Sequence, residues 1–66
     1  MNKFVVVATG NLWQCRRGPR VLASFDSLGE ALALAEMEAS MYRPSQVAVQ
    51  YEEGRLEVVS RYGAFH

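Results

Sequence analysis

Apolar and polar residues alternate along most of this chain, and one segment has a helical period instead. Between Ser27 and Tyr42 the apolar residues recur every three or four positions, which is the spacing of one side of an α-helix. Ser27 followed by Glu30 has the spacing of a capping box at a helix start, and Pro44 cannot continue a helix. The pattern therefore predicts a helix over residues 27–42.

The predicted helix carries two apolar arcs. The first is expected to face the core and consists of Leu28, Ala31, Leu32, Ala35, Ala39 and Tyr42. The second lies on roughly the opposite side and consists of Leu34, Met37 and Met41. Two interpretations of the second arc stay open: isolated exposed apolar residues that need no partner, or a surface that meets a second copy of the chain or another protein.

Strand patterns lie on both sides of the predicted helix. They cover residues 3–9, 12 to 16 or 17, 20–25, 45–51 and 55–62. The first is apolar on both faces, which is typical of a central strand, and turn residues such as Gly10 and Asn11 separate the strands. The order of elements predicts an α+β fold with two layers, an antiparallel-rich sheet and one helix on one face. Which of the last two strands lies beside the first stays open.

One helix covers one side of a sheet, so strand alternation divides the remaining residues into two faces. The expected core beneath the helix is Phe4, Val6, Ala8, Trp13, Val21, Ala23, Phe25, Val47, Val49, Tyr51, Leu56 and Val58. The expected uncovered face is Val5, Val7, Gln14, Arg16, Leu22, Ala48, Gln50, Glu57, Val59 and Arg61. The second set is apolar with arginines at its margin, which resembles a protein interface; the alternative is that its valines reflect strand propensity alone.

Length and composition indicate a single domain over residues 1–66. Half of the 66 residues are apolar, and a domain of this size buries only ~60% of its unfolded surface. A lone cysteine excludes an intrachain disulfide, so self-association is a common remaining route to stability. The chain contains no apolar run of signal-peptide or membrane-spanning length, and we expect a soluble, cytoplasmic protein with no membrane partner.

The charges sum to zero but are unevenly distributed. Residues 1–25 contain four basic residues and no acid, whereas all seven acids lie between Asp26 and Glu57, so the molecule is expected to have two electrically different sides. Trp13, Arg16, Arg17 and Arg20 form the one basic cluster with an aromatic residue. This cluster predicts, as an alternative function, a nucleic-acid-binding turn; a solvated turn or a contact with an acidic partner would explain it equally.

The sequence does not favour catalysis. Cys15 is the only thiol; three arginines nearby could activate it, but a lone cysteine within a strand is more often a small buried apolar residue. His66 is the last residue, where a base or ligand is poorly held. Cysteine–histidine and serine–histidine–aspartate arrangements, metal-ligand clusters and phosphate-binding glycine loops are all missing from the sequence. We therefore expect no cofactor, no metal and no enzyme activity.

The spacing of several residues resembles a family of small bacterial and phage domains of unknown function. The shared positions are Val5, Val6, Trp13, Phe25, Asp26, Ser27, Glu30, Ala31, Val47, Val49, Gly54, Ser60, Tyr62 and Gly63. The chain departs from that pattern at Gln50 and Tyr51, where a histidine is usual, and at Arg61 within the terminal motif. The resemblance implies the same arrangement of strands, helix and turns and a link to phage genes, and it brings no activity with it.

These observations lead to one main functional prediction. We expect a non-catalytic protein-binding module, a small regulator or inhibitor that occupies the surface of a protein partner or forms a homodimer. The residues expected to make the contact are Leu34, Met37 and Met41 on the helix, or Val5, Val7, Val59 and Arg61 on the uncovered sheet face.

Overall fold

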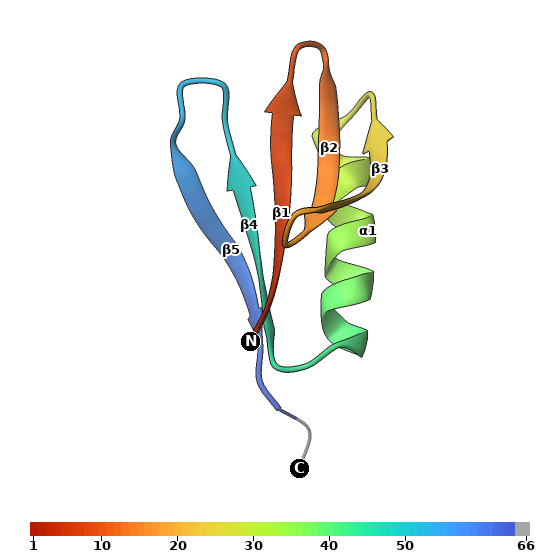
Figure 1. The fold of residues 1–66 in the computed structure, drawn as a ribbon, viewed down its shortest axis with the longest axis vertical. Coiled ribbons are helices and arrows are strands. Elements are labelled where there is room, and N and C mark those ends of the chain that lie inside the picture. The colour runs from red at the N-terminus through yellow and green to blue at the C-terminus, as the bar shows by residue number, and fades with distance from the viewer. Residues whose placement is uncertain (65–66) are drawn as a thin grey trace.

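Five strands form one mixed sheet, and a single helix lies across one face of it (Figure 1). The structure is a computed structural model that describes residues 1–64. Its elements are β1 (Asn2–Thr9), β2 (Leu12–Arg17), β3 (Arg20–Phe25), α1 (Leu28–Met41), β4 (Ser45–Gln50) and β5 (Leu56–Tyr62). The predicted α+β fold, with its order of three strands, one helix and two strands, is confirmed.

The strands lie in the order β3-β2-β1-β4-β5, so the apolar first strand is the central one, as its composition predicts. β1 pairs in parallel with β4, and every other neighbouring pair is antiparallel. A parallel pair needs a crossover connection, and α1 supplies it between β3 and β4. The structure thereby answers the open question of strand order, because β4 lies beside β1 and β5 lies at the edge.

The helix begins and ends close to where its sequence signals lie. Ser27 has extended backbone angles and its hydroxyl oxygen accepts a hydrogen bond from the Glu30 amide at 3.2 Å. The same hydroxyl donates to the Glu30 carboxylate at 3.1 Å, so the pair satisfies a first-turn donor and holds the cap in place. The Tyr42 amide donates to the Glu38 carbonyl at the other end. Tyr42 itself is 40% exposed, so its predicted place on the core side of the helix is wrong.

The core lies between the central strands and a stripe of alanines on the helix. Ala31, Ala35 and Ala39 recur every four residues and are fully buried. Their small side chains let α1 lie close to the sheet, where they meet the fully or almost fully buried Phe4, Val6, Cys15, Val47 and Val49. Leu28, Leu32 and Leu34 flank this stripe and pack partly against it. Leu34 therefore does not lie on the far side of the helix, and the prediction that groups it with the exposed methionines is wrong.

A β-bulge changes the register of the edge strand β3. Cys15 pairs with Ala23 and Arg16 pairs with Val21, which leaves Leu22 as an additional residue between the two pairs. Leu22 packs against the core, while Val21 is 48% exposed. The sequence prediction has these two residues on the wrong faces, because regular alternation does not allow for the extra residue.

The opposite edge strand, β5, contains a second bulge. Val47 pairs with Ser60 and Ala48 pairs with Val58, which leaves Val59 as the extra residue. Ser60 therefore shares the helix side with Val47, while Leu56 and Val58, at 59% and 36% exposed, lie outside the core. The prediction that Leu56 and Val58 belong to the core is wrong.

The second bulge also brings two hydroxyl groups to the helix. The Ser60 hydroxyl donates to one carboxylate oxygen of Glu36 at 2.5 Å, and the Tyr62 hydroxyl donates to the other at 2.6 Å. Hydrogen bonds to an ionised acceptor are the stronger kind. Glu36 therefore ties the edge strand β5 to the helix at a place where apolar contact is sparse.

We predict that enlarging Ala35 destabilises the fold. An Ala35→Leu side chain has no space between helix and sheet, and overpacking of this kind costs about 1–3 kcal/mol. Ala33 is exposed on the same helix, so Ala33→Leu should change the free energy of unfolding by no more than about 0.5 kcal/mol. Urea denaturation of the two variants measures the difference; equal stabilities would show that the alanine stripe does not set the helix–sheet distance.

We further predict that Glu36 delays the titration of one tyrosine. The hydrogen bond to Glu36, followed by burial and by the charge of Glu36, raises the pKa of Tyr62 above its ordinary value. A raised folded-state pKa means that the stability from this contact is complete below the ordinary pKa of tyrosine and is lost as the pH rises past it.

Ultraviolet titration of phenolate in the three-tyrosine chain should therefore show one late tyrosine. Glu36→Gln should return its pKa toward the ordinary value, and Tyr62→Phe should remove this component. Glu38→Gln is the matched control on the same helix and should leave the titration unchanged. A parent-like titration in Glu36→Gln would show that the contact does not form in solution.

Candidate binding surfaces

The face of the sheet opposite α1 has no element over it, and we call it the open face. Residues that pair across neighbouring strands share a face, so the pairings assign it. Its members are Lys3, Val5, Val7, Thr9, Leu12, Gln14, Arg16, Val21, Ser24, Gln46, Ala48, Gln50, Leu56, Val58 and Arg61. Glu57 pairs with Val49 and so lies on the helix side, which makes its predicted place on the open face wrong.

A row of side chains crosses the open face from edge to edge. Val21, Arg16, Val5, Ala48 and Val58 are paired in sequence across all five strands. Four of these five are apolar, and the two edge valines are the most accessible members of the row. The row therefore forms an apolar strip interrupted by one guanidinium group.

The charges on the open face are all of one sign. Lys3 and Arg61 both flank Gln46 in the register, at one end of the strands, and Arg16 lies in the apolar strip. Within residues 1–64, no Asp or Glu is assigned to this face. The acids lie instead on the helix, in the turns and on the helix side of β5. The predicted electrical difference between two sides of the molecule is therefore present, with the open face as the basic side.

The exposed part of the helix presents a smaller apolar surface. Met37 and Met41 are 54% and 60% exposed and lie one turn apart. Leu34 does not join them, because it packs partly against the core. This surface therefore consists of two flexible side chains rather than the three-residue patch that the sequence predicts.

The structure separates the four residues of the predicted nucleic-acid-binding turn. Arg17 lies over the rings of Tyr42 and Phe4, at 4.2 and 5.7 Å from their centres, and donates to Asn2 at 3.0 Å. Arg16 belongs to the open face, and its Nε donates to the Gln14 side chain at 2.6 Å. Trp13 lies at the opposite end of β2 from the turn.

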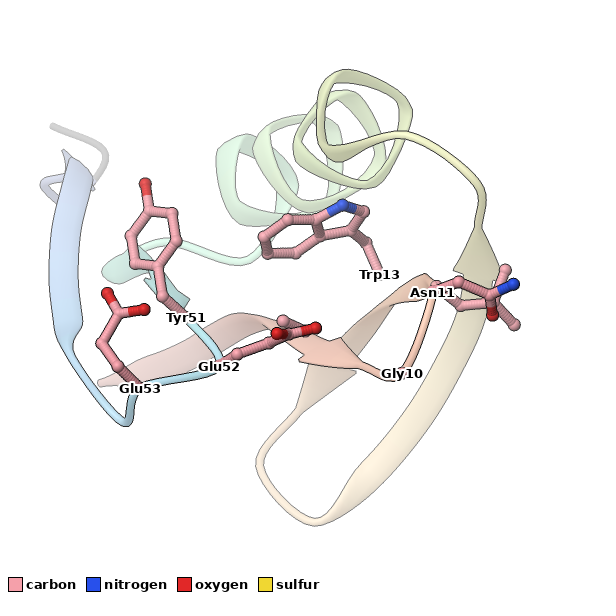
Figure 2. Close-up of a pocket in the computed structure, with 8 residues that line it drawn as sticks. Gly10, Asn11, Trp13, Tyr51, Glu52 and Glu53 are labelled. Atoms are coloured by element: carbon pink, nitrogen blue, oxygen red, sulfur yellow. The ribbon is translucent and has the colours of Figure 1, made fainter.

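A pocket of about 310 Å³ lies at the other end of the sheet, beyond the carboxyl ends of the parallel strands β1 and β4 (Figure 2). The turn at Gly10 and the segment after β4 form its two sides; it is lined by Ala8, Gly10, Asn11, Leu12, Trp13, Tyr51, Glu52 and Glu53. The rings of Trp13 and Tyr51 stand almost at right angles, with centres 6.1 Å apart. Sequence reasoning did not find this site, because its two aromatic residues come from opposite halves of the chain.

The chemistry of Cys15 is that of a buried thiol. It is fully buried in the core, and burial, followed by the charge of Glu38, raises its pKa. Since the thiolate is the nucleophile, the arginines in the sequence nearby do not activate this residue. His66 lies outside the described residues. Among residues 1–64 no three potential ligands of the His, Cys, Asp and Glu type come together to hold a metal ion.

Comparison with known proteins adds no relative to this picture. No protein-family model, no curated protein and no solved structure matches the chain. The similarity to small bacterial and phage domains therefore stays a prediction. None of the helices in the described residues is both long enough and apolar enough to cross a membrane.

We predict that Cys15 reacts slowly with thiol reagents in the native protein. Its burial and raised pKa should make labelling by Ellman's reagent more than about tenfold slower than that of an exposed thiol. The matched control is Ser24→Cys in a Cys15→Ala background, since Ser24 is exposed on the neighbouring strand β3. The labelling rate of Cys15 should also rise at a higher pH than the control's. Equal rates and equal pH profiles would restore Cys15 as a candidate nucleophile.

Proposed function

We propose that this chain is a non-catalytic protein-binding module that uses the open face of its sheet to occupy the surface of a protein partner. One observation carries this proposal: a five-stranded sheet is covered by a helix on one side only, and the other side presents an apolar strip with basic residues. Freely solvated faces of antiparallel sheets are ordinarily polar. An apolar strip with a charged margin is typical of surfaces that bind other proteins.

The chemistry of the open face describes the partner it would accept. Valine and alanine side chains favour an apolar counterpart, and Lys3, Arg16 and Arg61 favour acidic groups around it. A second copy of this chain is the other occupant that we consider, because small domains commonly gain stability by self-association. Both occupants use the same residues, so the oligomeric state in solution separates them.

The role we assign is that of a small regulator or inhibitor. Occupying a surface needs no reacting group, and the one thiol of the chain is buried with a raised pKa. The resemblance to small bacterial and phage domains supports the same role and a link to phage genes. A free, unpaired cysteine is compatible with a reducing compartment, and we place the function in the cytoplasm.

Nucleic-acid binding through the basic turn is the alternative, and the geometry favours it less. Trp13 and the arginines do not form one site, and the rows of the open face contain no aromatic ring among their described residues on which a base could stack. This alternative predicts affinity that falls steeply with salt and with loss of Arg16, Arg17 and Arg20.

We predict that Val58→Glu weakens association at least about tenfold, because a buried, unpaired carboxylate is costly at an apolar interface. Val58 is 36% exposed at the edge strand, so the fold should tolerate the change, and circular dichroism verifies this. Met37→Glu adds the same charge on the helix and is the matched control, which should associate like the parent. The measurement is sedimentation equilibrium at low and high salt.

Each outcome of this experiment has a distinct meaning. A dimer that persists in salt and is lost only in Val58→Glu supports self-association through the open face. If the parent is a monomer, both variants serve as baits, and a protein retained by the parent and Met37→Glu but not by Val58→Glu supports a separate partner. Loss in Met37→Glu alone would move the site to the helix, and salt-sensitive binding of an oligonucleotide would favour the alternative function.

A further inference from the structure

The pocket beyond the carboxyl ends of β1 and β4 combines aromatic walls with acidic ones. Trp13 and Tyr51 supply two rings at 87° to each other, and Ala8 and Leu12 supply aliphatic surface. Glu52 and Glu53 are the only ionisable side chains in the lining apart from the Tyr51 phenol. The pocket thus has the size of the smaller ligand sites in proteins and offers negative charge beside the faces of aromatic rings.

The two carboxylates are not equivalent. Glu53 accepts a hydrogen bond from Arg55 Nε at 3.1 Å and is neutralised by it. Glu52 has neither an ion pair nor a hydrogen bond from its side chain within residues 1–64. Because a ligand placed against the rings would reduce the water around Glu52, a neutral or anionic ligand would be disfavoured there and a cation would be favoured.

The chain itself shows how a cation is held on this side of the sheet. The Arg55 guanidinium that contacts Glu53 also lies over the Tyr51 ring, with its central carbon 4.3 Å from the ring centre. One ring and one carboxylate of the pocket therefore already hold an organic cation together. Trp13 is the better ring for such a contact, and neither it nor Glu52 has a cation of its own among the described residues.

We propose that this pocket binds a weakly hydrated organic cation, an alkylated ammonium or a guanidinium group, against Trp13 with Glu52 as its counter-charge. Such a group occurs in free small molecules and in the side chains of proteins, and the shared head group is what the pocket recognises. This site goes beyond the protein-binding function above, because Trp13 and Tyr51 lie on the helix side of the sheet and the open face lies on the other.

The chain contains a built-in reporter for this site. Trp13 is its only tryptophan, so ligand binding changes the single source of indole fluorescence. The parent protein is titrated with choline and with 3,3-dimethyl-1-butanol, which has the same shape without the charge; sodium chloride at the same ionic strength corrects for salt. Choline should give a saturable change and the neutral alcohol should bind more weakly by about two- to fivefold or more.

Two further probes distinguish the source of the cation. The amides of Nα-acetyl-trimethyllysine and Nα-acetylarginine present the same head groups on a peptide backbone. Tighter binding of either than of choline indicates a protein side chain as the natural ligand, and tighter binding of choline indicates a free small molecule. Both results support the cation site.

Charge variants test whether the carboxylate is used. Glu52→Gln should weaken choline binding about two- to fivefold, whereas Glu57→Gln, which removes an equally exposed acid outside the pocket, should not. Arg55→Gln releases Glu53 and removes a positive charge at the rim, so it should strengthen choline binding and leave the neutral alcohol unaffected. Circular dichroism confirms that each exposed substitution leaves the fold intact.

Three results would overturn the proposal. They are equal binding of choline and its neutral analogue, equal effects of Glu52→Gln and Glu57→Gln, and the lack of any saturable change in Trp13 fluorescence. The Val58→Glu variant keeps this test separate from the protein-binding proposal: it should bind choline like the parent even where it has lost its protein partner.

Discussion

The fold depends on how closely one helix can approach a five-stranded sheet. Ala31, Ala35 and Ala39 place almost no side-chain volume between α1 and the central strands, so the larger Phe4 and Val47 fill that layer from the sheet side. Close packing at this contact is what a chain of 66 residues has in place of a disulfide or a metal. The helix is too narrow to cover the edge strands equally well, and the contact of Glu36 with Ser60 and Tyr62 compensates at one edge.

The elements of the fold could be predicted from the sequence, and the register of its edges could not. Ser27, Gly10 and Pro44 act locally, through caps and turns, so the helix and strand boundaries follow from nearby residues. A β-bulge depends on pairing with another strand, and the pattern around Leu22 and Val59 does not reveal one. Each bulge shifts the later residues of its strand to the other face, which is why Val21, Leu56 and Val58 were expected in the core and are exposed instead.

The same limit explains which parts of the candidate sites were found. Val5 and Val7 lie on the central strand, where alternation holds, and their place on the open face could be predicted. The pocket could not, because Trp13 and Tyr51 meet only through the parallel pairing of β1 with β4. Sequence reasoning grouped Trp13 with the arginines nearest to it in the chain, whereas the length of β2 separates them.

Stacked arginines explain why the two binding surfaces differ in charge although the chain is neutral. Arg17 lies over Tyr42, and Arg55 lies over Tyr51 and contacts Glu53, so both guanidinium groups are engaged within the fold on the helix side. Lys3 and Arg61 have no acidic neighbour on their own face and set its sign. A basic, apolar sheet face and an acidic, aromatic pocket attract opposite kinds of ligand. The two surfaces can therefore be occupied at the same time, by an acidic protein on one side and a cation on the other.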